Sequence, residues 1–289
     1  MSSSPARPSV LTGIALVVTA MACFATLDTT AKLVSASVPL LMGIWFRYCF
    51  QALMTTLVVV PRFGVAVLKT QHPRFQILRG LLLLISSFFA FSSLLYLPVA
   101  DFTAIGSLVP LIITLLAARM LGEQVSKRRW VLVLGGFAGA MLIIRPGGAN
   151  FIWPMLLPLG AVVTYSWFQL LTSHMVKTED PGAIHFYTGI VGLVASTAVL
   201  PWAWQPLASG ALWGLAALIG CFSSLGHYLL IRAYHHAPVS RLMPYLYAQI
   251  GFATLAGWLV FDHAPDRWTW LGMGLIVLCG LMGVRSRLN

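Results

Sequence analysis

Apolar residues dominate the chain from Val10 to Val284, and short polar patches interrupt them about every 25 residues. A helix rises 1.5 Å per residue, so roughly 17–25 apolar residues cross a hydrocarbon core ~30 Å thick. The apolar runs have about this length, and short segments connect them. The pattern predicts an all-α polytopic membrane protein with ten transmembrane helices, at residues 11–31, 40–60, 77–96, 101–120, 130–145, 152–173, 184–203, 211–233, 239–261 and 268–285.

Composition extends this prediction to the whole protein. Hydrophobic residues make up 59% of the 289 positions and charged residues 9%, whereas soluble domains carry about 25% charged residues. Too little polar surface is available to cover a soluble core of this size. The lipid bilayer is therefore the expected surroundings of the chain, and its function is expected within the membrane.

The net charge of +11 is explained by orientation rather than by nucleic-acid binding. With a cytoplasmic N-terminus, 14 of the 18 Lys and Arg residues fall on the inner side, and only Lys32, Arg145 and Arg267 fall outside. Such a bias is typical of cytoplasmic loops. We expect a multi-pass protein of a bacterial inner membrane, with both termini cytoplasmic and no nucleic-acid partner.

The chain also repeats itself at an offset of 140 residues. Gly80, Pro98, Val99, Thr114, Leu115, Trp130 and Arg145 are matched by Gly220, Pro238, Val239, Thr254, Leu255, Trp270 and Arg285. Two repeats of five spans follow, at residues 11–145 and 152–285. Because five is odd, the second repeat is expected to be inverted in the membrane, as in many secondary transporters.

Enzyme and metal chemistry have no support in the sequence. The chain contains no GxxxxGK[ST], HExxH or GxSxG motif. Its four cysteines lie apart in apolar runs, which indicates buried thiols rather than a metal site. We expect no enzymatic activity, no cofactor and no resident metal.

Polar residues within spans are costly in lipid and are therefore candidates for substrate binding. In span two, Arg47 can bind a carboxylate or phosphate, with Gln51 one turn further on the same face. Alternatively, Arg47 pairs with Asp28 or extends to the outer headgroups. In span nine, Tyr245 and Gln249 either line a cavity or join neighbouring helices.

Three further spans carry candidates of the same kind. His227 in span eight either binds substrate or a proton, or is a packing residue. Ser87 in span three and Tyr165 and Trp167 in span six either line an amphipathic pocket or pack between helices. No Asp or Glu falls at the middle of a predicted span, and Asp28 lies near the outer end of span one. Coupling of transport to protons would therefore need His227 or Asp28. Exchange of one substrate for another is the alternative.

Small residues give one expectation about packing. Gly135 and Gly139 form GxxxG in span five, and span ten is also rich in glycine. Such residues allow close approach of helices. They predict either tight packing within the chain or a homodimer contact.

Several motifs resemble a known family. The stretch Tyr96-Leu-Pro-Val-Ala-Asp101, with Pro110, Leu121-Gly-Glu123 and Trp130, is similar to the core of EamA repeats, and residues 234–247 with Trp270 form a second copy. In that copy Asp262-His263 replaces the usual Gly-Glu pair. The resemblance implies the drug/metabolite transporter superfamily, with ten helices, inverted repeats and a central cavity. Trp45-Phe-Arg-Tyr48 and Leu78-Arg-Gly80 resemble a subgroup of S-adenosylmethionine carriers and exporters of amino-acid-derived metallophores.

These expectations combine into a secondary transporter with alternating access. Its cavity is expected between the halves, lined by spans one, three, four, six, eight and nine. The substrate is a small polar or zwitterionic metabolite, amino-acid-like or an opine-type metallophore, and by the resemblance its transport is outward. Import of a metabolite, for example of S-adenosylmethionine, is the second possibility. A membrane subunit that does not transport is the third possibility.

Overall fold

The computed structural model describes residues 10–120, 127–145, 148, 151–237 and 242–285. Within them, the ordered elements are all helical, which confirms the all-α prediction. They are α1 (Val10–Val34), α2 (Leu40–Phe63), η1 (Val65–Leu68), α3 (Pro73–Tyr96), α4 (Val99–Gly106), α5 (Val109–Met120), α6 (Lys127–Ile144), η2 (Trp153–Leu156), α7 (Leu157–Met175), α8 (Pro181–Val199), η3 (Leu200–Trp202), α9 (Gly210–His236), η4 (Met243–Tyr247), α11 (Ala248–Phe261) and α12 (Arg267–Arg285). The Leu121-Gly122-Glu123 motif lies outside the described residues.

Helix length and composition fit a membrane protein. In the part of the chain that the structure describes, six helices are long and apolar enough to cross a membrane. Four shorter apolar segments, at Val99–Ile113, Trp130–Ile144, Tyr245–Phe261 and Arg267–Cys279, fall in the remaining predicted spans. Large apolar side chains such as Leu57, Val131 and Leu259 are 61–69% exposed, as expected where a helix faces lipid.

Local sequence explains where several helices start. Pro73 and Pro181 occupy the first positions of α3 and α8, where a missing N–H costs nothing. The Asp180 carboxylate accepts a hydrogen bond from the backbone N–H of Gly182 at 2.6 Å. The Ser209 hydroxyl accepts one from Leu212 at 3.4 Å. Asp180 and Ser209, which belong to polar interruptions of the sequence, thus cap α8 and α9.

Spans four and nine are interrupted, although the hydropathy pattern predicts each as one helix. Ser107 and Leu108 separate α4 from α5, and the 3₁₀ segment η4 passes into α11 at Tyr247. Pro110 follows the first break, and a proline ring clashes with the carbonyl four residues earlier. Ser107 and Tyr247 are 140 residues apart, so the two interruptions occur at equivalent positions of the sequence repeat.

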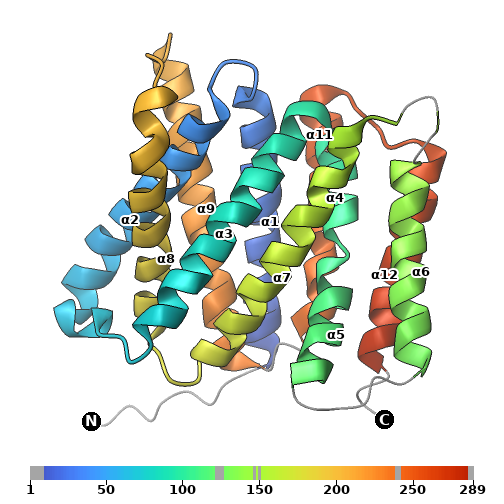
Figure 1. The fold of residues 1–289 in the computed structure, drawn as a ribbon, viewed down its shortest axis with the longest axis horizontal. Helices are drawn as coiled ribbons and strands as arrows, with labels where there is room; N and C mark the ends of the chain where they lie inside the picture. Colours follow the sequence, from blue (N-terminus) through green and yellow to red (C-terminus); the bar gives the residue numbers. More distant parts are fainter. Residues whose placement is uncertain (1–9, 121–126, 146–147, 149–150, 238–241, 286–289) are drawn as a thin grey trace.

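Helix packing follows the same repeat. The most extensive contacts join α1 to α9, α6 to α12, α3 to α7 and α2 to α8. Counted as predicted spans, α1–α9 pairs the first span with the eighth, and α3–α7 pairs the third with the sixth. Exchanging the two halves converts one of these pairs into the other. The α2–α8 and α6–α12 pairs each join equivalent spans, and in Figure 1 they stand at opposite edges of the molecule.

Two glycines matched by the repeat have equivalent neighbours. A Cβ atom on Gly80 of α3 would lie 2.6 Å from Val191 of α8. A Cβ atom on Gly220 of α9 would overlap the Phe50 side chain of α2. Both glycines therefore allow a helix from one half to approach a helix from the other half closely.

The GxxxG segment of α6 packs within the chain. A Cβ atom on Gly139 would lie 2.8 Å from the carbonyl oxygen of Gly272 on α12, and one on Gly135 would lie 2.7 Å from the sulfur of Cys279. Of the two alternatives for these glycines, the structure shows packing within the chain. A homodimer stays a prediction.

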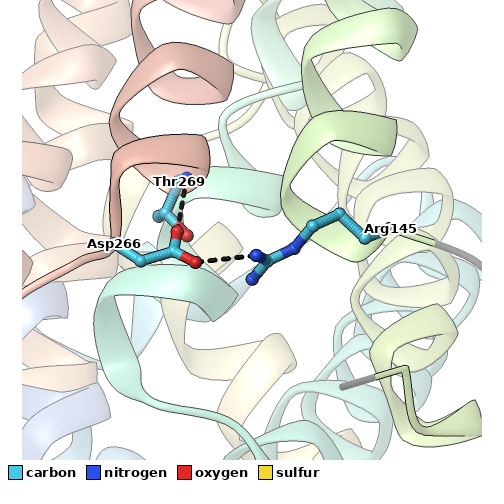
Figure 2. A network of polar contacts seen from close by, with 3 residues as sticks. All are labelled: Arg145, Asp266 and Thr269. Atoms are coloured by element: carbon cyan, nitrogen blue, oxygen red, sulfur yellow. Dashed lines mark hydrogen bonds and ion pairs between the residues drawn. The ribbon is translucent and has the colours of Figure 1, made fainter. Parts of the chain in front are cut away.

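An ion pair joins the ends of α6 and α12. Arg145 lies 2.8 Å from Asp266, whose other carboxylate oxygen accepts a hydrogen bond from the backbone N–H of Thr269 at 2.8 Å (Figure 2). This backbone hydrogen bond, more than Arg145, holds the pKa of Asp266 below its ordinary value. Both side chains are partly exposed, so the pair is expected to add little stability.

Candidate functional site

A cavity lies among the helices, with an empty volume of about 870 Å³, its open side included. Helices α1, α3, α4, α5, α7, α9 and α11 contribute its walls, together with η4 and with Arg47 from α2. These elements comprise the six spans expected to line a cavity. The polar side chains of its wall are Asp28, Arg47, Ser86, Ser87, Thr103, Ser107, Tyr165, His227, Tyr247 and Gln249.

Arg47 brings a buried positive charge to the cavity. Its side chain is 4% exposed. The guanidinium donates hydrogen bonds to the hydroxyls of Ser87 and of Ser223, the latter at 2.7 Å. Both partners are neutral, and no carboxylate among the described residues lies within ion-pair distance. An arginine with five N–H donors in such a place can bind a carboxylate of a ligand in a bidentate manner.

Asp28 brings a carboxylate to the same cavity. It is 7% exposed, and one of its oxygens accepts a hydrogen bond from the Gln249 amide at 3.1 Å. This bond joins α1 to α11, so Gln249 both connects helices and lines the cavity. A carboxylate in this position can accept hydrogen bonds from an ammonium group of a ligand.

An aromatic corner surrounds His227. The ring of Phe24 lies 4.7 Å from it, and the rings of Phe168 and Tyr165 lie at 5.8 and 6.3 Å. Nδ1 of His227 donates to the backbone carbonyl of Ser223 at 2.9 Å, because a carbonyl can only accept. Nε2 is buried without a hydrogen-bond partner among the described residues and is then an acceptor for a ligand N–H or O–H.

The structure brings six of the sequence candidates together and places three elsewhere. Asp28, Arg47, Ser87, Tyr165, His227 and Gln249 line the cavity. Gln51 is fully buried beside His185, at 3.5 Å from its Nδ1. Trp167 and Tyr245 are 39% and 37% exposed and are not part of the cavity wall.

Sequence reasoning missed the layer of residues behind this wall. Arg79 counts as an inner-side charge in the sequence, but its side chain is completely buried in α3. His185 of α8 is also buried, and its Nε2 lies 2.9 Å from the Ser224 hydroxyl. The Tyr48 hydroxyl lies 2.9 Å from Ser87, and this tyrosine is inaccessible to solvent. The sequence signals for Arg79 are its position inside the predicted span 77–96 and its place in the Leu78-Arg-Gly80 stretch.

The side chains of the cavity wall suit a small ligand that carries a positive and a negative charge. A carboxylate and a guanidinium face one space, and apolar and aromatic side chains such as Phe24, Leu83 and Phe102 make up most of the remainder. Pockets that bind small molecules combine an apolar lining with a few placed polar groups. In the described residues no cluster of three or more His, Cys, Asp or Glu is arranged for a metal ion.

Comparison with known proteins identifies several similar transporters. The chain is 30% identical over 248 residues to the S-adenosylmethionine uptake transporter of Rickettsia bellii, covering 84% of this chain and 82% of that protein. It is 27% identical over 245 residues to the riboflavin transporter of Rhizobium johnstonii, covering 85% and 81%. It is 26% identical over 282 residues to the pseudopaline exporter CntI of Pseudomonas aeruginosa, covering 95% and 96%.

A solved crystal structure shares the fold. It superposes with a TM-score of 0.69 at 19% sequence identity and covers 96% of both chains. The family model described as the EamA-like transporter family matches residues 11–145 and again residues 152–284. The two matches cover most of the sequence, and the named relatives are membrane transporters of small molecules in bacteria. The chain therefore belongs to the EamA-like transporter family, within the drug/metabolite transporter superfamily.

Proposed function

We propose that this protein exports a small zwitterionic metabolite across the inner membrane, and that the cavity is its substrate site. The observation that carries the proposal is Arg47, a buried arginine that faces the cavity with only neutral partners among the described residues. A bound carboxylate could form the direct ion pair that Arg47 does not make with Asp28. Asp28 would bind the cationic end of the same substrate.

The substrate class follows from the side chains around these two charges. Phe24, Tyr165 and Tyr247 add apolar surface and hydroxyl groups to the cavity. An amino-acid-like compound, or an opine-type metallophore built from amino acids, has carboxylate, amine and apolar parts that match them. Gln249 and His227 would complete recognition by hydrogen bonds.

Alternating access between two inverted five-helix repeats is the proposed mechanism. The packing of equivalent helix pairs and the equivalent interruptions of spans four and nine support it. Interrupted helices at the midplane are a recurring feature of substrate sites in transporters with such repeats. The two halves would rock around the cavity and expose it to one side at a time.

The direction of transport has two candidates. The pseudopaline exporter matches over 96% of its length and supports export. The S-adenosylmethionine uptake transporter supports import of a zwitterion that also carries an adenine ring for the aromatic corner. Deletion of the gene, followed by metabolite measurement in cells and medium, separates them. An exported compound accumulates in the cells of the deletion strain, and an imported one remains in the medium.

Variants of Arg47 test the site itself. We expect Arg47→Gln to abolish measurable transport of the identified metabolite and Arg47→Lys to retain part of it, because lysine keeps the charge but loses the bidentate geometry. Lys177→Ala, at an exposed position between α7 and α8, is the matched control. Transport is measured in proteoliposomes at equal protein content. Wild-type transport by Arg47→Gln would contradict the assignment of Arg47 to the substrate site. No metabolite difference on deletion would contradict transport itself and favour a membrane subunit without transport.

Coupling to protons would involve Asp28 or His227, the two titratable candidates in the cavity wall. The unpartnered Nε2 of His227 supports this role. Full transport driven by a pH gradient in both Asp28→Asn and His227→Ala would exclude both residues and favour substrate exchange.

A further inference from the structure

Arg79 is a second buried arginine, separate from the cavity wall. One of its terminal nitrogens donates to the Thr172 hydroxyl of α7 at 3.2 Å, and the other donates to the Ile184 carbonyl and the Thr188 hydroxyl of α8. Its guanidinium lies over the Phe168 ring, 5.2 Å from the centroid. Three helices therefore hold this side chain, and solvent does not reach it.

The surroundings of Arg79 leave its charge and one donor unmatched. Each hydrogen-bond partner is neutral, and the buried Nε–H has no acceptor in the part of the chain that the structure describes. Among the described residues no carboxylate lies within ion-pair distance. A buried charge without a counter-ion is costly, and polar groups deep in membrane proteins commonly mark substrate pathways. A structural connection between three helices does not require this charge, because a neutral donor can also make hydrogen bonds.

Polar groups at adjacent positions of α8 and α9 lie beside Arg79 and beside Arg47. Ser223 accepts a hydrogen bond from Arg47, and the next residue, Ser224, lies 2.9 Å from Nε2 of His185. The residue before His185 is Ile184, whose carbonyl accepts from Arg79. Adjacent positions on α9 and on α8 therefore carry polar groups that contact Arg47 at one end and Arg79 at the other, and we call these groups the polar strip.

Phe168 gives a second connection. Its ring contacts Tyr165 and His227 of the cavity at 5.6 and 5.8 Å, and it also lies under the Arg79 guanidinium. Gln51, beside His185, has a buried amide oxygen that finds no partner within the described ranges. The polar strip therefore offers the amide oxygen of Gln51 as a hydrogen-bond acceptor, in addition to the positive charges of the two arginines.

The strip continues from Arg79 to one end of the helix bundle. Gln76, one turn earlier on α3, is fully buried and donates to the Thr70 hydroxyl at 3.4 Å. Glu179, between α7 and α8, accepts hydrogen bonds from Thr70 and from the backbone N–H groups of Gln71 and His72 at 2.8–3.0 Å. At 5% exposure, this carboxylate closes the end of the strip by joining the α7–α8 turn to the start of α3.

We propose that Arg79 is a second binding station for the anionic group of the substrate, at the end of the pathway that the Glu179 contacts cover. When the Glu179 contacts open, the substrate carboxylate would bind Arg79 and pass along the polar strip between Arg79 and Arg47. The inference rests on the proposed transport function, and it assigns the chain a second anion site that is distinct from the cavity.

Chemical modification of arginine tests this site without relying on the transport rate. Full-length protein in proteoliposomes is treated with phenylglyoxal, and mass spectrometry reports the modification of Arg79 and Arg47 separately. The probes are S-adenosylmethionine and its decarboxylated form, which lacks the carboxylate. Glu179→Ala opens the closed end, and Lys177→Ala is its control on the same turn.

We expect phenylglyoxal to modify Arg79 slowly in the wild type and several-fold faster in Glu179→Ala, but not in Lys177→Ala. S-adenosylmethionine should slow the reaction of both arginines several-fold, and the decarboxylated form should not. An Arg79 that is never modified in the folded protein, or that is modified without protection while Arg47 is protected, would overturn the second station and leave the proposed function intact. Absence of protection at both arginines would count against the cavity as a carboxylate site as well.

Discussion

At the scale of single residues, neighbours on one helix have opposite surroundings. Tyr165 of α7 lines the cavity and accepts a hydrogen bond from Gln169 at 3.2 Å, whereas Trp167 is 39% exposed. We predict that Tyr165→Ala lowers transport about tenfold, since an aromatic contact contributes roughly 0.5–1.5 kcal/mol beyond its buried area. Trp167→Ala should transport at the wild-type rate. Initial rates in proteoliposomes, at equal protein content, provide the measurement, and the reverse order of the two variants would remove Tyr165 from the site.

At the scale of elements, α6 and α12 approach each other through glycine. A Cβ atom on Gly139 would lie 2.8 Å from the Gly272 carbonyl, whereas one on Gly274 would meet no described atom within 4 Å. Backbone atoms cannot move aside as a flexible side chain does, so the two helices must separate. We predict that Gly139→Ala destabilises the protein by about 1–3 kcal/mol, as overpacking commonly does, and that Gly274→Ala changes stability little. Thermal unfolding in detergent measures both, and equal melting temperatures would show that this helix pair adjusts freely.

At the scale of the whole molecule, the positions of Lys and Arg predict which end of the bundle faces the cytoplasm. The turn at Thr178, between α7 and α8, should be cytoplasmic, and the segment at Gln205, between η3 and α9, should be outside. Single cysteines at these positions, in a background without the four native cysteines, should differ in labelling by a membrane-impermeant maleimide added to intact cells whose outer membrane has been permeabilised. Cysteine at 205 should react and cysteine at 178 should not. The opposite labelling would reverse the orientation and place the Glu179 contacts on the outer side.

The sequence alone determined the class of the protein and much of its architecture. Hydropathy is a local property, so the helical, membrane-spanning character and most helix bounds could be derived from it. The 140-residue offset, present in the residues themselves, indicated that Gly80 and Gly220 are equivalent before their packing was known. Arg47, Asp28 and Gln249 were found as candidates because a polar residue in an apolar span is rare and costly.

Only the tertiary structure decided which of those polar residues share one space. A helical face is readable from spacing, but the helix that it meets is not, because that depends on packing between segments far apart in sequence. Gln51 lies one turn from Arg47, yet it faces His185 of α8 and not the cavity. Arg79 has the spacing of a flanking charge, and only the convergence of α3, α7 and α8 shows it buried among neutral partners. The site is a set of long-range contacts, and such contacts are fixed by the fold as a whole.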